Sequence, residues 1–152
     1  LTSELSSPVL YELGLEPAIE WVASQMRKRF DLETRVQWDR QPKPMDEQIR
    51  NVLFQATSEL LTNVVKHAGT RTATVEIERN GRNIHISVKD NGVGFNGATL
   101  KSAHENRDAF GLFNIRERLK HLGGSFLIES TPGRGTRATL VAPLKLDGSH
   151  DA

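Results

Sequence analysis

The sequence lacks cysteine altogether, so disulfide bonds and thiolate metal sites are excluded. Its apolar runs are too short to cross a bilayer. The phosphate-binding pattern Gly-x-x-x-x-Gly-Lys-Ser/Thr is also absent. Neither sign of charge is in excess. The formal net charge of the 152 residues is +1, which gives no general argument for nucleic acid or an acidic membrane as partner. Hydrophobic residues make up 37% of the chain, as is typical of a globular domain with a buried core.

Segments with helical and strand periodicity alternate along the chain. Helices are predicted where apolar residues recur every three or four positions, and strands where apolar and polar residues alternate. The pair Asn80 and Gly81, between two such strands, predicts a tight hairpin. The pattern predicts an α/β two-layer sandwich, a mixed sheet of about five strands with about three helices on one face. The helix ranges are 17–30, 46–67 and 112–122, and the strand ranges are 33–39, 72–78, 83–89, 125–130 and 136–142.

Three segments follow neither periodicity. Residues 1–15 include Pro8 and Gly14 and are predicted to be a linker. The polar segment 96–109 is long for a structureless loop, and loops of that length are usually functional or mobile. Residues 147–152 are predicted to be a disordered tail. The folded domain is therefore predicted to cover residues 16–146.

The second predicted helix carries a row of polar residues near its end. Glu59, Asn63 and His67 are four positions apart, and Lys66 lies three positions beyond Asn63. Such spacing places side chains on one helix face. A carboxylate and an amide oxygen suit Mg²⁺, and a cation suits phosphate charge. The alternative interpretation is a solvated helix face with no ligand.

A second motif follows the strand at 83–89. The carboxylate of Asp90 is followed by Gly92 and Gly94. A carboxylate at a strand end could accept a hydrogen bond from an amino group such as that of adenine. The alternative is a turn in which the carboxylate caps its own backbone.

Two further glycine motifs lie near the third helix and the last strand. Gly111 and Leu112 precede the predicted helix, and a glycine there can leave the first N–H groups free to bind an anion. Gly133 and Gly135 lead into the strand that carries Thr136 and Thr139, whose hydroxyls could contact a base. The alternatives are a flexible helix start and a tight hairpin.

These motifs, in this order and at this spacing, resemble those of the Bergerat-fold ATPases. That superfamily includes DNA gyrase, a heat-shock chaperone family and sensor histidine kinases. Within it, the chain is similar to the catalytic, ATP-binding domain of a bacterial sensor histidine kinase. Residues 63–68 and 111–118 are most similar to the nitrate-sensor-like subgroup. The resemblance covers about residues 5–145, and residues 5–15 resemble the end of that group's dimerisation region.

The resemblance implies a magnesium and phosphate site on the second helix. Asn63 would coordinate Mg²⁺ through its side-chain oxygen. Glu59 would support that site indirectly and orient the attacking group or a water. Lys66 and His67 would contact the phosphates. Glu59 and Asn63 are thus the implied catalytic residues, and the implied cofactors are ATP and Mg²⁺.

The same resemblance implies where the rest of ATP would bind. Asp90 would accept a hydrogen bond from the adenine amino group, and Thr136, in preference to Thr139, would complete the base site. Residues 96–109 would form a lid over the phosphates, with Gly111 and Leu112 as its hinge and phosphate contact. The other glycines of the motifs would let the backbone pass close to the nucleotide; they are Gly92, Gly94, Gly133 and Gly135.

One part of a histidine kinase has no counterpart here. Kinases of this group carry the phosphorylated histidine on a separate helical domain, inside a short acidic motif. The chain is therefore predicted to bind ATP without phosphorylating itself. The implied partners are the histidine-bearing dimerisation domain of the same kinase and, through it, a response regulator. The implied full-length protein is a homodimer, with this domain in the cytoplasm and contacting neither nucleic acid nor membrane. The histidines outside any such motif are His67, His85, His104, His121 and His150.

Two alternatives remain open at this stage. The first is another enzyme of the same fold, such as a serine-phosphorylating anti-sigma factor or a slow ATP hydrolase. The second is a non-catalytic module that binds nucleotide only to regulate a partner.

Overall fold

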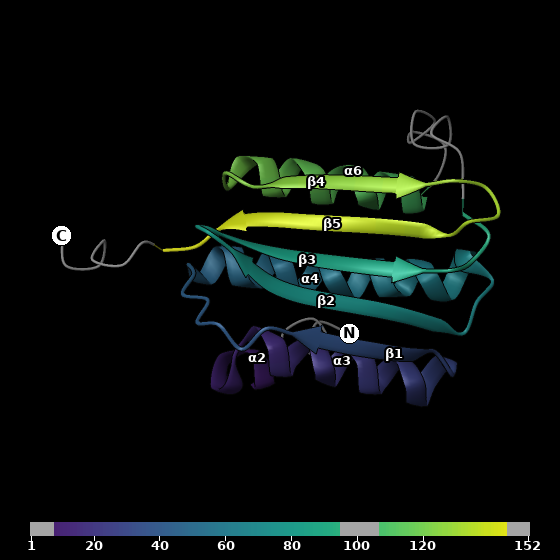
Figure 1. Ribbon diagram of the computed structural model, residues 1–152, viewed down its shortest axis with the longest axis horizontal. Helices are drawn as coiled ribbons and strands as arrows, with labels where there is room; N and C mark the ends of the chain where they lie inside the picture. The colour runs from purple at the N-terminus through teal and green to yellow at the C-terminus, as the bar shows by residue number, and fades with distance from the viewer. Residues whose placement is uncertain (1–7, 95–106, 146–152) are drawn as a thin grey trace.

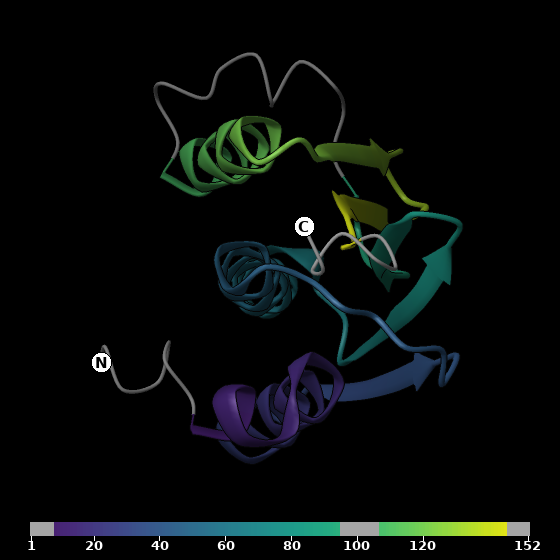
Figure 2. The same cartoon turned by 90° about the vertical axis from the view of Figure 1, so that its left-hand side faces the viewer.

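The structure, a computed structural model, describes residues 8–94 and 107–145, and of residues 107–110 the backbone alone. Its strands form one sheet in the order β1-β2-β3-β5-β4 (Figure 1). β1 runs parallel to β2, and every other neighbouring pair is antiparallel. The helices cover one face of this sheet (Figure 2), so the predicted two-layer sandwich is confirmed. The strands are β1 Glu33–Trp38, β2 Thr72–Asn80, β3 Asn83–Asp90, β4 Ser125–Ser130 and β5 Thr136–Pro143.

The core lies between the sheet and three long helices. Apolar side chains on the inner faces of α3, α4 and α6 pack against alternate residues of the central strands. No helix in the described ranges is both long and apolar enough to cross a membrane. The helices are α2 Pro8–Leu13, α3 Leu15–Phe30, α4 Glu47–Asn63, the π-helical turn η1 Val64–Ala68, and α6 Arg107–His121.

Helix α2 lies within the segment predicted to be a linker. Its Leu10 is only 2% exposed and belongs to the hydrophobic core. Proline is tolerated in the first turn of a helix, so Pro8 does not prevent this short element. Gly14, with φ of 98°, separates α2 from α3. The segment 8–13 is therefore helical and packed, although the boundary between linker and domain stays a prediction.

Helix α4 confirms the predicted apolar stripe but not the predicted end. Its inward side chains, from Ile49 to Leu60, are almost fully buried. The α-helix ends at Asn63, and residues 64–68 continue as a π-helical turn, a feature that is frequent at functional sites. Gly69, in the left-handed conformation, ends the element as predicted.

Helix α6 begins five residues before its predicted start, at Arg107. Gly111 is consequently inside the helix and does not precede it. Glycine in a helix costs about 1 kcal/mol relative to alanine, which is why a sequence pattern favours it as a boundary. Residues 107–109 of the predicted lid are helical, and the rest of that lid, at 96–106, lies outside the described residues. The same is true of the tail at 147–152.

The four motifs gather at one end of the molecule. β3 ends at Asp90 where β5 begins, because Asp90 pairs with Thr136 in the antiparallel register. The C-terminal end of α4 and the beginning of α6 lie at this same end, on the right of Figure 1. Segments far apart in the sequence therefore meet at one edge of the sandwich.

Candidate nucleotide-binding site

Asp90 is a buried carboxylate at the end of β3. The residue is only 7% exposed. Its Oδ1 accepts a hydrogen bond from the Gly92 N–H at 2.8 Å, and the backbone N–H of Thr136 also donates to the carboxyl group. Burial raises the pKa of Asp90 above its usual value, and these two hydrogen bonds offset only part of that rise. A carboxylate held in this way has remaining acceptor capacity for a ligand donor such as an amino group.

Thr136 is the threonine that lies beside Asp90. Its hydroxyl is 2.8 Å from the Ser130 hydroxyl, which lies opposite it in the β4–β5 pair. A cavity of about 130 Å³ is lined in part by Asp90, Ser130 and Thr136. Thr139 lies three positions further along β5, opposite Ser87, with 3.4 Å between the two hydroxyls. The geometry supports Thr136 over Thr139 for a contact beside Asp90.

Ser130 is a site residue that the sequence analysis missed. Its hydroxyl also donates to the Gly135 carbonyl at 3.1 Å, so it ties the start of the turn to its end. A serine at a strand end is unremarkable by itself. The sequence could have indicated Ser130 only through its position opposite Thr136 in the predicted hairpin. That position is known only once the register of β4 and β5 is known.

The glycines after Asp90 lie where backbone segments meet. A Cβ on Gly92 would be 2.0 Å from the Ala68 carbonyl oxygen, and the neighbouring Val93 N–H donates to that same oxygen at 2.8 Å. A Cβ on Gly94 would be 2.2 Å from the Thr131 carbonyl oxygen. Their immediate neighbours are thus backbone atoms of the protein, which explains these glycines without a ligand. Approach to a nucleotide stays a prediction.

The second glycine loop packs against the first. The Gly133 N–H donates to the Val93 carbonyl at 2.6 Å. Gly135 has φ of +81°, and a Cβ there would be 2.1 Å from the Asp90 carbonyl oxygen. An L side chain at this position would be strained and would displace Asp90. Both loops and the end of η1 therefore form one packed unit.

Glu59 joins α4 to α6. A Cβ on Gly111 would be 2.1 Å from Glu59 Oε1, so the carboxylate occupies the space that the absent side chain leaves. Glu59 and Asn63 are both partly buried and lie one turn apart on α4. The side chain of Leu112 is 9% exposed and belongs to the core, so only its backbone remains for a phosphate contact.

Lys66 and His67 lie in the π-helical turn and are exposed. A π-helix has more residues per turn than an α-helix, so His67 does not continue the row of Glu59 and Asn63 as regular α-helical spacing predicts. Both residues remain at the same end of the molecule as Asp90.

The donor atoms fit magnesium held together with a phosphate. Within the described residues, no group of three or more His, Asp or Glu side chains could hold a metal ion. Mg²⁺, however, is commonly bound through one or two protein oxygen ligands, with waters and substrate phosphates completing its shell. Glu59 and Asn63 offer oxygen donors of this kind on adjacent turns.

Comparison with known proteins shows similarity to a family of ATPases and to several sensor histidine kinases. Residues 48–146 match the family described as "Histidine kinase-, DNA gyrase B-, and HSP90-like ATPase". The chain is 33% identical over 144 residues to the sensor histidine kinase NarS of Mycobacterium tuberculosis, covering 95% of this chain and 33% of NarS. It is 29% identical over 144 residues to the oxygen sensor histidine kinase NreB of Staphylococcus carnosus, covering 95% and 40%.

A third relative is an uncharacterized sensor-like histidine kinase of Chloroflexus aurantiacus. It is 38% identical over 98 residues, which are 64% of this chain and 16% of that protein. The chain thus spans less than half the length of each of these three relatives. The predicted resemblance to a histidine-kinase ATPase domain is confirmed, and the similarity to NarS agrees with the predicted subgroup. The chain belongs to the histidine kinase-, DNA gyrase B- and HSP90-like ATPase family.

Proposed function

We propose that this chain is the ATP-binding catalytic domain of a two-component sensor histidine kinase, donating the γ-phosphate of ATP to a histidine on a separate helical domain. The observation that carries the proposal is the buried Asp90, paired with Thr136 at the end of the sheet where Glu59 and Asn63 also lie. The names of the relatives support this reaction. The proposed partners are the histidine-bearing domain, within a homodimeric kinase, and a response regulator.

The residues of the chain would divide the work of binding and positioning. Asp90 would accept a hydrogen bond from the adenine amino group, with the Thr136 hydroxyl beside it. Glu59 and Asn63 would hold Mg²⁺ against the phosphates, where the ion supplies charge neutralisation. The exposed Lys66 would add positive charge at the same end. Phosphoryl transfer depends mainly on such positioning and electrostatic stabilisation, so these roles suffice for a donor domain.

None of the described histidines lies in a short acidic motif like the one that carries the phosphorylated histidine in the kinases this chain resembles. His67 is proposed instead to contact the phosphates, His85 lies on β3, and His121 lies in the last turn of α6. The proposed acceptor therefore belongs to another domain. Phosphate transferred to that domain should be labile to acid and stable to base. Acid-stable phosphate on serine would favour the anti-sigma-type kinase instead.

Calorimetric titration with a non-hydrolysable ATP analogue tests the proposal directly. We expect binding that strengthens with Mg²⁺. Asp90→Asn should weaken binding by about tenfold or more, since a hydrogen bond to a charged group contributes about 1.5–3 kcal/mol. Asn63→Ala should mainly remove the dependence on Mg²⁺. Unchanged affinity of the Asp90→Asn variant would contradict the adenine assignment, and no binding to the wild type would favour a regulatory module.

A further inference from the structure

Strand β1 lies at an edge of the sheet and has one open side. It pairs with β2, and within the described residues no strand pairs with its other side. The N–H groups of Glu33 and Asp39 donate to carbonyls on the β2 side at 2.8 and 3.3 Å. Because backbone groups alternate in direction along a strand, those of Thr34 and Val36 point away from β2. An exposed row of this kind can pair with another chain.

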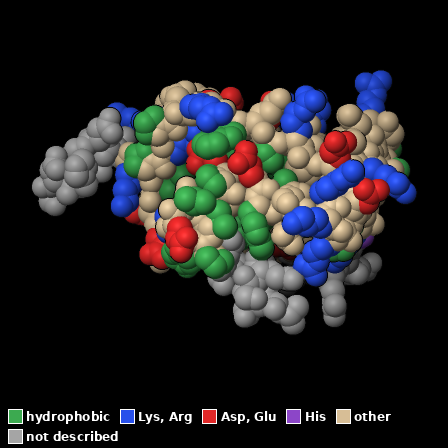
Figure 3. Space-filling model, turned by 90° about the horizontal axis from the view of Figure 1, so that it is seen from below, with side chains coloured by type: hydrophobic (Ala, Val, Ile, Leu, Met, Phe, Trp, Pro, Cys, Tyr) green, Lys and Arg blue, Asp and Glu red, His purple; other side chains and the backbone are tan. Residues whose placement is uncertain are grey.

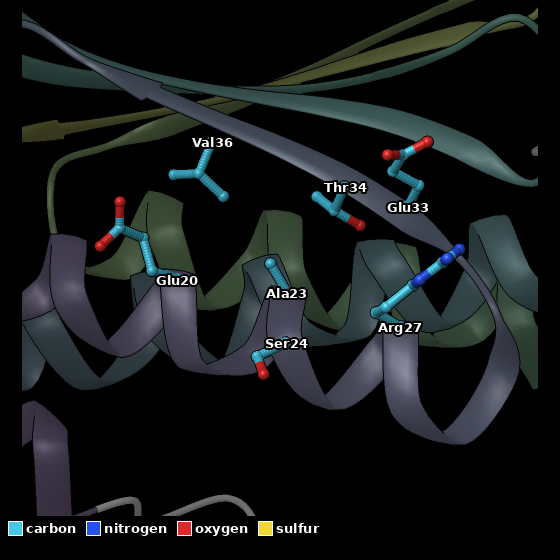
Figure 4. A pocket seen from close by; sticks show the side chains of 7 residues that line it. All are labelled: Glu20, Ala23, Ser24, Arg27, Glu33, Thr34 and Val36. Atoms are coloured by element: carbon cyan, nitrogen blue, oxygen red, sulfur yellow. The ribbon is translucent and has the colours of Figure 1, made fainter.

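A groove of about 340 Å³ runs between this open edge and helix α3 (Figure 4). Small side chains from α3 leave room in its middle, and charged side chains lie at its ends. The groove thus has a strand edge as one wall and a helix as the other, which is an arrangement that suits an added strand. Its lining residues are Glu20, Ala23, Ser24 and Arg27 on α3, and Glu33, Thr34 and Val36 on β1.

Thr34, which lines the groove, has a hydroxyl with no hydrogen-bond partner in the described residues. Its Oγ1 atom is buried. Its side chain lies between β1 and α3 in Figure 4. A buried hydroxyl without a partner costs free energy, which a polar group entering the groove would recover.

The charges along the groove indicate the chemistry of its occupant. Glu20 and Arg27 are seven positions apart on α3, a rise of about 10 Å. Arg27 is already paired with Asp31 at 2.9 Å, and Glu33 also lines its end of the groove. Glu20 is therefore the charge that selects the occupant, and it favours a cation. Figure 3 shows this side, with Lys and Arg gathered toward the end where α3 ends.

The space beside β1 fits a single strand better than a second copy of the chain. Helix α3 lies alongside β1 at the edge of the molecule (Figure 2). Paired strands are about 4.8 Å apart, whereas packed helices need about 8–10 Å. Two copies meeting at their β1 edges would bring their α3 helices into collision. A lone extended segment carries no such helix.

We propose that the groove between β1 and α3 binds an extended segment of a partner protein, which adds to the sheet beside β1. The segment pairs with the open backbone groups of Thr34 and Val36. It carries a cation toward Glu20 and a small polar side chain that reaches the Thr34 hydroxyl. This surface is separate from the proposed nucleotide site, since none of its lining residues belongs to that site.

The test uses a defined peptide, acetylated and amidated, of sequence Thr-Lys-Val-Ser-Val-Glu-Thr. It is titrated into the ¹⁵N-labelled chain while the amide signals of Thr34 and Val36 are followed. Two control peptides carry two lysines or two glutamates in place of the mixed pair, so they are independent of strand direction. We expect the two peptides that carry lysine to bind more tightly than the two-glutamate peptide and to slow hydrogen exchange at both amides. Binding that is equal for all three peptides, or that leaves β1 unshifted, overturns the proposal.

A charge-reversed variant sharpens the test. Glu20→Lys should weaken the two-lysine peptide about two- to fivefold and make the two-glutamate peptide the preferred ligand. Val36→Pro removes an outward N–H and should abolish peptide binding, while unchanged affinity for the ATP analogue shows that the variant is folded. Full peptide binding by a folded Val36→Pro variant refutes strand addition.

Discussion

At the scale of single residues, the candidate site contains a carboxyl group, that of Asp90, whose burial costs free energy. Asp90 is buried as a carboxylate although burial raises its pKa, so its charge is unfavourable in the folded protein. Asp39, at the opposite end of the sheet, is the reverse case. Burial alone would raise its pKa, but hydrogen bonds from Lys43 and from the N–H groups of Arg79 and Gln41 outweigh burial and lower it. Of these two carboxyl groups, the one whose negative charge opposes folding is therefore Asp90, in the candidate site.

The two carboxyl groups should therefore give opposite pH dependences of stability. With its raised pKa, folded Asp90 binds a proton more readily than the unfolded chain does, so its contribution is lost as pH rises through the folded pKa. The difference in free energy of unfolding between Asp90→Asn and the wild type should therefore shift in favour of the variant as pH rises above about 4, the usual pKa of an aspartate. Urea unfolding of both proteins over this range measures the difference.

Asp39→Asn is the matched control. The lowered pKa of Asp39 means that its contribution is present above the unfolded pKa and is lost as pH falls. The free energy of unfolding of the wild type should therefore rise relative to that of Asp39→Asn as pH rises. If both differences had the same sign, the burial argument for Asp90 would fail.

Gly111 is a residue whose missing side chain positions another residue. In Gly111→Ala the new Cβ would displace the Glu59 carboxylate, whose flexible end can move without unfolding the helix. Stability should stay unchanged or rise by up to about 1 kcal/mol, because alanine favours a helix interior. The Mg²⁺-dependent binding of an ATP analogue should weaken several-fold, as measured by calorimetry.

Glu59→Gln identifies the cause of that loss. If Gly111→Ala acts by moving Glu59, the double variant should bind no more weakly than the worse single variant. Fully additive losses would show that Gly111 acts through something other than Glu59.

At the scale of elements, each helix makes a different contribution. α4 supplies both the buried stripe and the polar pair Glu59 and Asn63, and its π-helical turn brings the Ala68 carbonyl to the Val93 N–H. α6 contacts α4 through Gly111. α2 is short, and only its packing can hold it in place, because isolated helices of this length are unstable in water.

The packing of α2 predicts a specific stability difference. Leu10→Ala should lower the free energy of unfolding by about 2–4 kcal/mol, since a buried leucine loses contacts and leaves a cavity. Leu13→Ala, on the same helix, changes a side chain that is 66% exposed and should have an effect within about 0.5 kcal/mol. Urea unfolding followed by circular dichroism compares them. Equal effects would mean that α2 is the loose linker predicted from the sequence.

At the scale of the whole molecule, the site exists only in the folded chain. Its residues come from α4, β3, α6 and β5, which the fold brings to one end of the sandwich. A nucleotide that binds this site does not bind the unfolded chain, so it should stabilise the fold by mass action. At about 100 times the dissociation constant, the gain is about 2.7 kcal/mol.

Thermal unfolding with and without the ATP analogue and Mg²⁺ measures this coupling. The wild type should be stabilised in proportion to the logarithm of analogue concentration, and Asp90→Asn should need far higher concentrations for the same shift. A wild-type midpoint that stays constant at saturating analogue would exclude binding at this site.

The sequence alone was sufficient for the features that depend on local pattern. Alternation of apolar residues predicts every strand, the stripe from Ile49 to Leu60 predicts α4, and the spacing of Asp90 and its glycines carries the family resemblance. These features can be predicted from the sequence because periodicity and motif spacing are properties of residues that are close together in the chain.

Tertiary structure decided the features that depend on contacts between distant segments. It placed Ser130 beside Thr136, filled the space at Gly111 with Glu59, and packed the two glycine loops on each other and on Ala68. It also held Leu10 in the core and left the edge of β1 open beside α3. None of these follows from local spacing, because each requires the strand register and the helix packing that only the complete core imposes.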